Sequence, residues 1–250
     1  MDIDDFLSDK DKEEIKDFID KNMICPANQK IEKYYIAYID LLGMKAKMIN
    51  ETDECFCNFA NQFAGIVDSI NSEINSRNKL SKEKIEFHMF SDNIIFLCKN
   101  FHCLFDYIAL LQRRIIIQLG IFMSGIIDYG SIYYYKDRFI LGSGLVSAYD
   151  ADSTYHHPAI KVGRNIEIDK LKGKAIKRVG YDEVVIDYLT HSSLYDRYDF
   201  LEEVKIHEEI IKQNLLKYKD KENIYSKYRW LKEYHNSVCK KMNLEQYQIK

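Results

Sequence analysis

Two aspartates are the residues in this sequence best suited to catalysis. Asp40 is the only charged residue in the apolar run YYIAYIDLL, residues 34–42, and Asp92 separates the β-rich runs KIEFHMF and NIIFLCK. A carboxylate at the end of an apolar strand is costly to bury unless its charge is compensated, and a bound cation compensates it most simply. If the two carboxylates meet, they form a site for Mg²⁺ or Mn²⁺, ions that support phosphoryl transfer.

The turn that follows Asp40 has features typical of phosphate binding. In LLGMK, Gly43 allows a close approach of the backbone, and the N–H groups at the helix start that follows, beginning at Met44, can receive phosphate oxygens. Lys45 and Lys47 add positive charge to this segment. A plainer interpretation stays open, because a single strand or turn aspartate is most often an edge, cap or turn residue.

The pattern of the chain predicts elements that would bring the two aspartates together. In order, it predicts a strand at 34–42, a helix at 53–78, a hairpin with Asp92 at its tip, a helix at 102–118, two strands joined near Gly130, a helix at 145–155 and a strand at 159–162. This order predicts an α/β (α+β) protein with a ferredoxin-like βαββαβ core and an extra hairpin, helix and strand. The first strand of such a core lies beside the hairpin, so Asp40 and Asp92 can converge.

Composition and charge indicate how the chain is divided into domains and which classes of partner are excluded. We expect an N-terminal helical arm at 1–30, a catalytic domain at 31–165 and a C-terminal helical extension at 166–250. A net charge of -3 gives no basic field for nucleic acid, so we expect no nucleic-acid partner. The sequence has an acidic start and no apolar run near the roughly 20 residues that cross a membrane, which predicts a cytoplasmic protein without membrane insertion. Six cysteines without a CxxC pair indicate reduced thiols rather than a zinc site.

Three segments, in order along the chain, resemble the motifs of class III nucleotide cyclases. YIDLLGMKAKM resembles their first metal motif, MFSDNIIF resembles the second, and GIIDYGSIYYYKDRFILGSGLVSAYDAD resembles the later glycine-rich strand, hairpin and helix. The resemblance covers residues 34–163. It implies the nucleotide-cyclase form of the fold, with helical extensions at both ends.

The resemblance also implies roles for particular residues. Asp40 and Asp92 would be the catalytic ligands of two Mn²⁺ or Mg²⁺ ions. Leu41 would be a further metal ligand through its backbone carbonyl, and Tyr38 would line the triphosphate site. The family works as a homodimer that holds the nucleoside triphosphate between subunits. The ribose 3′-hydroxyl attacks the α-phosphate, which yields a 3′,5′-cyclic monophosphate and pyrophosphate.

Departures from the cyclase pattern change the expected substrate. Ser91 replaces a glycine, and Val146 and Asp150 stand where these cyclases carry a transition-state Asn and Arg. His88 and Phe139 occupy the positions that select a purine. With its compact size and divergent base-contacting positions, the chain is similar to the pyrimidine cyclases of Pycsar antiphage systems. That similarity implies UTP or CTP as substrate and a second messenger in antiviral defence as product.

Two other functions stay open on the sequence alone. The missing Asn and Arg equivalents favour a catalytically weak or inactive cyclase-fold module that binds a nucleotide or a partner. An oligonucleotide-forming polymerase with a similar palm-like core is the other alternative. It would need a second acidic residue beside Asp92, and Asn93 occupies that position.

Overall fold

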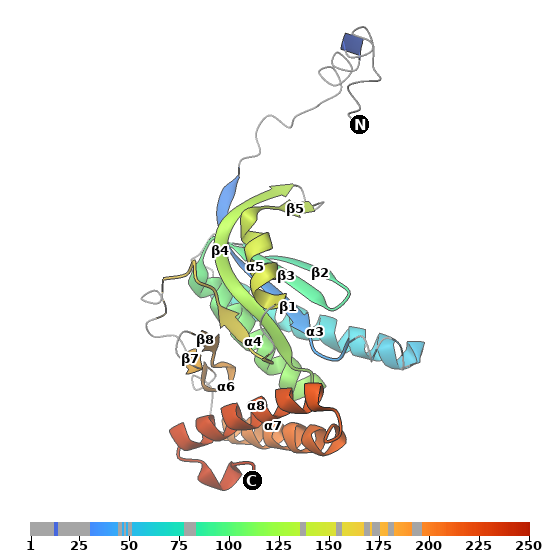
Figure 1. Cartoon of the computed structure of the whole chain (residues 1–250), viewed down its shortest axis with the longest axis vertical. Helices are drawn as coiled ribbons and strands as arrows, with labels where there is room; N and C mark the ends of the chain where they lie inside the picture. Colours follow the sequence, from blue (N-terminus) through green and yellow to red (C-terminus); the bar gives the residue numbers. More distant parts are fainter. Residues whose placement is uncertain are drawn as a thin grey trace.

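The computed structural model describes the chain in separate stretches: residues 13–14, 31–44, 47, 49, 52–77, 84–135, 139–153, 157–167, 171, 176–179, 183–191 and 197–250. In these stretches a twisted sheet has helices on both faces, and the last two long helices lie together at one end of the molecule (Figure 1). None of the described helices is both long and apolar enough to cross a membrane. The predicted N-terminal arm, 1–30, lies almost entirely outside the described residues.

Six elements form the predicted core. They are β1 (Glu32–Leu41), α3 (Asp53–Arg77), β2 (Glu86–Phe90), β3 (Asn93–Cys98), α4 (Phe101–Leu119) and β4 (Met123–Tyr135). Their strands lie in the order β2-β3-β1-β4, and each strand is antiparallel to its neighbours. This order confirms the ferredoxin-like arrangement, and it places β1 directly beside the β2–β3 hairpin.

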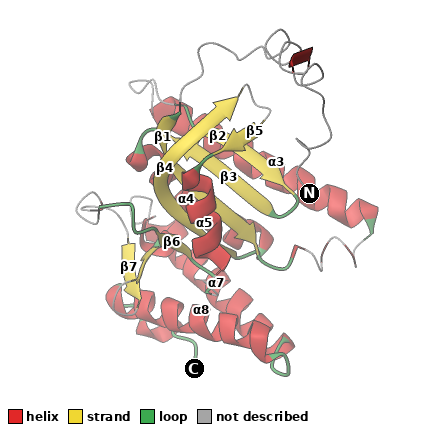
Figure 2. Cartoon of the chain, turned by 45° about the horizontal axis from the view of Figure 1, so that its top comes forward, coloured by secondary structure: helices red, strands yellow, loops and turns green. Residues whose placement is uncertain are grey.

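The rest of the chain extends this sheet and covers one end of it. The further described elements are β5 (Phe139–Leu141), α5 (Ser143–Ser153), β6 (Ile160–Val162), β7 (Ile176–Val179), β8 (Glu183–Ile186), α6 (Tyr188–His191), α7 (Arg197–Lys217), α8 (Glu222–Lys241) and the short 3₁₀ helix Glu245–Tyr247. β6 pairs in parallel with β4, and β8 and β7 continue the sheet beyond it, as Figure 2 shows for β4, β6 and β7.

The side chains of β1 alternate between two cores, as the pleat of a strand requires. Within 37–41, the odd-numbered residues are buried in the main core with α3 and α4, whereas Ile36 packs with Leu97 on the opposite face. Helix α5 lies on that opposite face (Figure 1). Tyr38 and Asp40 therefore share the α5 face, where side chains outside the main core are available for chemistry.

The helices α7 and α8 belong to the same core as the sheet. Val204 and Ile211 of α7 and Leu231 of α8 are buried in the main hydrophobic cluster. The buried Arg113 of α4 donates through Nε to the Glu203 carboxylate of α7 at 2.5 Å. The C-terminal helices are thus fixed against the domain that carries the two aspartates.

A buried polar chain also ties α7 to α8. The Tyr188 hydroxyl lies 2.7 Å from Nε2 of His207, and Nδ1 of His207 lies 2.9 Å from Nδ1 of His235. Nε2 of His235 lies 2.9 Å from the carbonyl oxygen of Tyr247. Burial, together with the neighbouring His235, lowers the pKa of His207 well below its ordinary value, so the ring is neutral. These contacts tie α7, α8 and the C-terminal segment to one another.

The structure differs from the sequence-based prediction in two places. The two strands that were expected to join near Gly130 are one continuous strand, β4, because residues 130–132 continue the ladder with β1 as far as Glu32. The chain reverses toward β5 only after Tyr135. The segment 166–250 is not purely helical, since it also contributes β7 and β8.

Helix α5 lies close to β4 because two glycines meet. A Cβ atom on Gly130 would lie 2.5 Å from the Cα of Gly144, and a Cβ on Gly144 would lie 2.3 Å from Cδ1 of Ile36. Real Cβ atoms do not approach other heavy atoms so closely. The contact between strand and helix is therefore backbone against backbone at this point.

Replacing Gly130 with alanine is expected to lower the free energy of unfolding by about 1 to 3 kcal/mol, because the added methyl group meets backbone and must displace α5. Urea denaturation of the purified protein measures this change. Gly65→Ala is the matched control, since Gly65 is exposed on α3 and a Cβ there meets no atom within 4 Å. That variant should keep or raise stability by about 0.5 to 1 kcal/mol. Equal stability of the two variants would contradict the tight contact.

Candidate active site

The structure brings the two predicted aspartates to the same end of the sheet. Asp40, near the end of β1, lies directly opposite Asn93 of β3 and Ser124 of β4. Asp92 occupies the turn just before β3, and its carbonyl oxygen accepts a hydrogen bond from the Leu41 N–H at 3.0 Å. The backbone of the hairpin tip is thus tied to the end of β1, which holds both carboxylates near one another.

The two carboxylates influence each other electrostatically. Burial is the larger cause that raises the pKa of the Asp40 carboxyl above its ordinary value, and the negative charge of Asp92 raises it further. Lys227 of α8 acts in the opposite direction. Asp40 is therefore a carboxyl whose ionised form needs additional positive charge, as the sequence pattern suggested.

A short chain of hydrogen bonds orients Asp92. The Tyr38 hydroxyl donates to Oδ1 of Asn93 at 2.5 Å, and Nδ2 of Asn93 donates to Oδ1 of Asp92 at 3.1 Å. The Tyr38 ring also meets Tyr149 of α5 edge-on, with centroids 5.7 Å apart. Sequence reasoning considered Asn93 only as a missing carboxylate. Its position opposite Asp40 in the strand register is the signal that identifies its supporting role.

The turn after β1 has the geometry of a backbone cradle. Gly43 has φ +87°, a conformation that glycine adopts without steric cost. The Lys47 N–H donates to the Gly43 carbonyl at 3.2 Å, which forms a helical turn directly after it. The Met44 side chain is buried in the main core, so only its backbone is placed to meet a ligand. Lys45 lies outside the residues that the structure describes.

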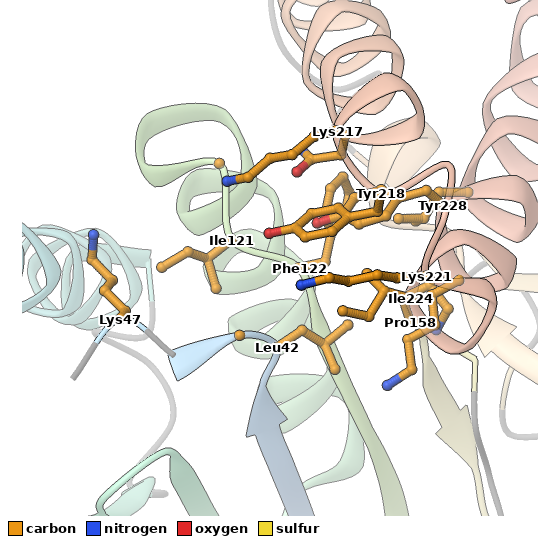
Figure 3. Close-up of a pocket in the computed structure, with 15 residues that line it drawn as sticks. Leu42, Lys47, Ile121, Phe122, Pro158, Lys217, Tyr218, Lys221, Ile224 and Tyr228 are labelled. Atoms are coloured by element: carbon orange, nitrogen blue, oxygen red, sulfur yellow. The ribbon is translucent and has the colours of Figure 1, made fainter. Parts of the chain in front are cut away.

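A pocket of about 620 Å³ opens beside this turn (Figure 3). It is lined by residues after β1 (Leu42, Gly43 and Lys47), by the segment 120–122, by Pro158, and by residues of α7, α8 and the turn between them. The Leu42 N–H donates to the Phe122 carbonyl at 2.9 Å, which ties the residues after β1 to the segment 120–122. The volume is in the range of small-molecule sites.

The donor set of the two aspartates fits a hard divalent cation. Carboxylate oxygens are ligands that Mg²⁺ and Mn²⁺ prefer, and positive charge between them would relieve the repulsion that Asp40 experiences. Within the described stretches, no group of three or more His, Cys, Asp or Glu residues could hold a metal. A cation at Asp40 and Asp92 therefore needs further oxygens, which the Leu41 backbone and a phosphate group can supply.

Two residues that depart from the cyclase pattern, Ser91 and His88, lie in the β2–β3 hairpin. Ser91, in place of a glycine, has φ +59° in the turn before Asp92, in the left-handed region that favours glycine. His88 of β2 lies opposite Ile95, which in turn lies opposite Tyr38, so His88 shares the face of Tyr38. Its position is suited to contacting a group bound over that face.

The helix α5 presents no group equivalent to a transition-state Asn or Arg. Val146 is 59% exposed, and the Asp150 side chain is exposed on the same helix. Neither residue has a positively charged side chain. The side chain of Phe139, the other position expected to contact a base, lies outside what the structure describes.

Comparison with known proteins gives structural likeness without sequence relatives. No protein-family model matches the chain. No curated protein matches its sequence. Several solved cyclase structures share 10–12% identity with it. The adenylyl cyclase CyaB from P. aeruginosa has a TM-score of 0.44, with 12% identity over 63% of this chain and 93% of that one.

Two fungal guanylyl cyclase domains give similar values. The GTP complex of the RhGC domain from Catenaria anguillulae has a TM-score of 0.47 and 11% identity, covering 62% of this chain and 96% of that chain. The non-canonical dimeric RhoGC domain from Blastocladiella emersonii has a TM-score of 0.46 and 10% identity, covering 63% and 96%. Similarity at this level does not transfer an activity, so function has to be argued from the chain's own residues.

Asp40→Asn is expected to raise the melting temperature near neutral pH in the presence of a chelator. The folded-state pKa of Asp40 is raised, so its contribution to stability is complete below the unfolded-state pKa and is lost as pH rises through the folded-state pKa. The variant should therefore melt at a higher temperature than wild type near pH 7. The difference in melting temperature should vanish below about pH 4. Thermal denaturation across this range measures it. A gain that persists unchanged at acid pH would contradict the raised pKa.

Proposed function

We propose that this protein is a nucleotide cyclase that converts UTP or CTP to the 3′,5′-cyclic monophosphate and pyrophosphate. The observation that carries the proposal is the meeting of Asp40 and Asp92 at one end of a ferredoxin-like sheet, beside the Gly43 turn. Two carboxylates next to a backbone phosphate cradle are the parts that metal-assisted phosphoryl transfer needs.

Each residue of the proposed site has a separate role in the reaction. Asp40, Asp92 and the Leu41 carbonyl would hold two Mn²⁺ or Mg²⁺ ions. Bound ions would supply activation of the ribose 3′-hydroxyl and neutralisation of the charge on the leaving pyrophosphate. The hydrogen bonds from Tyr38 through Asn93 keep the Asp92 carboxylate in one orientation. The N–H groups after Gly43, beginning at Met44, receive phosphate oxygens.

The pyrimidine preference rests on the positions that would contact the base. His88, on the face that carries Tyr38, stands where the purine cyclases that this chain resembles have a lysine. The proposed product is a second messenger, and the proposed setting is antiviral defence, because the chain resembles the Pycsar pyrimidine cyclases. A nucleotide-binding module without turnover is the second candidate, and the exposed Val146 and Asp150 on α5 favour it.

Asp40→Asn and Asp92→Asn are each expected to lower product formation at least 100-fold, because each change removes a ligand from ions that supply several kcal/mol of transition-state stabilisation. Incubation with each of the four ribonucleoside triphosphates and Mn²⁺, followed by chromatography, measures the cyclic product. Removing the metal with a chelator should abolish it in the wild type.

Asp68→Asn is the matched control for this assay. Asp68 is exposed on α3, and its change removes the same charge without touching the site. Its activity should equal that of wild type. Wild-type activity in Asp40→Asn or Asp92→Asn would refute the metal assignment. If the wild type makes no cyclic product from any triphosphate, the binding-module function replaces the cyclase.

The proposed active unit is a homodimer. Large apolar side chains are exposed around α5 and the neighbouring strands: Phe90 86%, Leu141 59%, Val146 59% and Tyr149 56%. Val146 and Tyr149 are one turn apart and share a face of α5. Exposed apolar side chains that gather into one patch mark interaction sites. A partner subunit seated here would supply the groups that α5 lacks.

Val146→Asp is expected to shift the protein from dimer to monomer and to reduce turnover at least tenfold, because a charge is placed where the partner would pack. Sedimentation equilibrium measures the assembly state. Leu216→Asp is the matched control, since Leu216 is 76% exposed on α7, away from α5. That variant should remain dimeric. A wild-type protein that is monomeric and fully active would overturn the proposal.

A further inference from the structure

The pocket beside the Gly43 turn is strongly basic. Lys47, Lys217, Lys221 and Lys227 line it, and no carboxylate is among the described residues of its lining. The chain as a whole is acidic, with a net charge of -3, so this concentration of positive charge is local. Apolar side chains, among them Ile121, form much of the remaining lining.

Three of these lysines come from the C-terminal helices. Lys217 ends α7, Lys221 precedes α8, and Lys227 lies in the second turn of α8. No acidic residue in the described part of the chain forms an ion pair with any of the three. Like charges placed together in this way repel one another. A bound anion would stabilise the arrangement.

Packing of aromatic rings holds the lysines in place. Tyr218 and Tyr228 are stacked, with centroids 5.8 Å apart and an interplanar angle of 7°, and Tyr228 meets Phe122 edge-on at 5.8 Å. Phe122 is bonded through its carbonyl to Leu42, the residue before Gly43. Figure 3 shows the side chains of Lys217 and Lys221 extending from the same wall of the pocket. The turn of α7–α8 is therefore a rigid support, not a loose tail.

The basic pocket lies beside the end of β1 that carries Asp40. Gly43, three residues after Asp40, lines the pocket, and Lys227 is close enough to Asp40 to lower the pKa of its carboxyl. An anion that reaches from the aspartates into the pocket must be long and carry several negative charges. A triphosphate chain has that form, and its oxygens suit both lysine ammonium groups and backbone N–H groups.

We infer that Lys217, Lys221 and Lys227 bind the terminal phosphates of the nucleoside triphosphate substrate, so that the C-terminal helices complete the active site of the same chain. The identity of the ligand as a nucleotide rests on the proposed function. The three lysines supply the positive charge that α5 lacks at Val146 and Asp150. They hold the pyrophosphate end of the substrate while Asp40 and Asp92 act at the α-phosphate.

The test measures binding of inorganic tripolyphosphate by the full chain in a chelator, using isothermal titration calorimetry at low salt. Lys221→Gln and Lys227→Gln are each expected to weaken binding about threefold to tenfold, since each removes one charge-assisted contact. Lys219→Gln is the matched control, because Lys219 is exposed in the same turn but does not line the pocket. Its affinity should stay within about twofold of wild type. UTP should displace the tripolyphosphate.

Three results would overturn the inference: no tripolyphosphate binding by wild type, equal weakening in Lys219→Gln and Lys221→Gln, or failure of UTP to compete. Asp40→Asn separates this inference from the cyclase proposal. It should bind metal-free tripolyphosphate at least as tightly as wild type, because it removes a nearby negative charge.

The two proposals can fail independently. If no cyclic product forms but the lysine variants weaken tripolyphosphate binding, the cyclase proposal fails and the phosphate site stands. If cyclic product forms and the lysine variants bind tripolyphosphate like wild type, the lysine assignment fails and the cyclase stands. With both proposals correct, the lysine variants raise KM for the triphosphate more than they lower kcat.

Discussion

A carboxylate at the end of a core strand is the constraint on which the rest of this structure depends. Asp40 belongs to a strand whose alternate residues are buried in the main core, and burial already disfavours its charge before Asp92 is considered. The surroundings compensate in two ways. One is Lys227, and the other, on the proposed assignment, is a cation held by the pair of aspartates.

The position of Lys227 depends in turn on how the C-terminal helices pack. The buried Arg113–Glu203 pair, the hydrogen bonds through His207 and His235, and the stacked tyrosines fix α7 and α8 against the sheet. A polar contact buried in this way is expensive to break, so the helices hold one orientation. The same contacts therefore stabilise the fold and position Lys227. A substitution that shifts α7 or α8 would change the electrostatic environment of Asp40.

Much of the fold could be predicted from local pattern, and the missing parts have physical causes. The strand that ends near Asp40, the hairpin around Asp92 and the helices α3 and α4 follow from clear apolar periods. β7 and β8 are four residues each and combine charged with apolar side chains, so no period is visible. β4 contains Gly130. A glycine at this position is typical of a turn, but here it allows the strand to contact α5. The convergence of Asp40 and Asp92 follows from the topology. The role of Asn93 can be recognised only from the strand register. The position of the lysines depends on tertiary packing, which no local sequence pattern predicts.

The order of these residues along the chain has a consequence during synthesis. Both aspartates are translated well before Lys217, Lys221 and Lys227, because all three lysines lie far downstream of them in the sequence. At usual translation rates the interval between Asp40 and Lys227 is about 10 to 40 s. On the proposed assignment, a nascent or prematurely terminated polypeptide carries the metal ligands but lacks the lysines that bind the terminal phosphates of the nucleotide. On the same assignment, copies cut short before Lys217 would form no cyclic nucleotide.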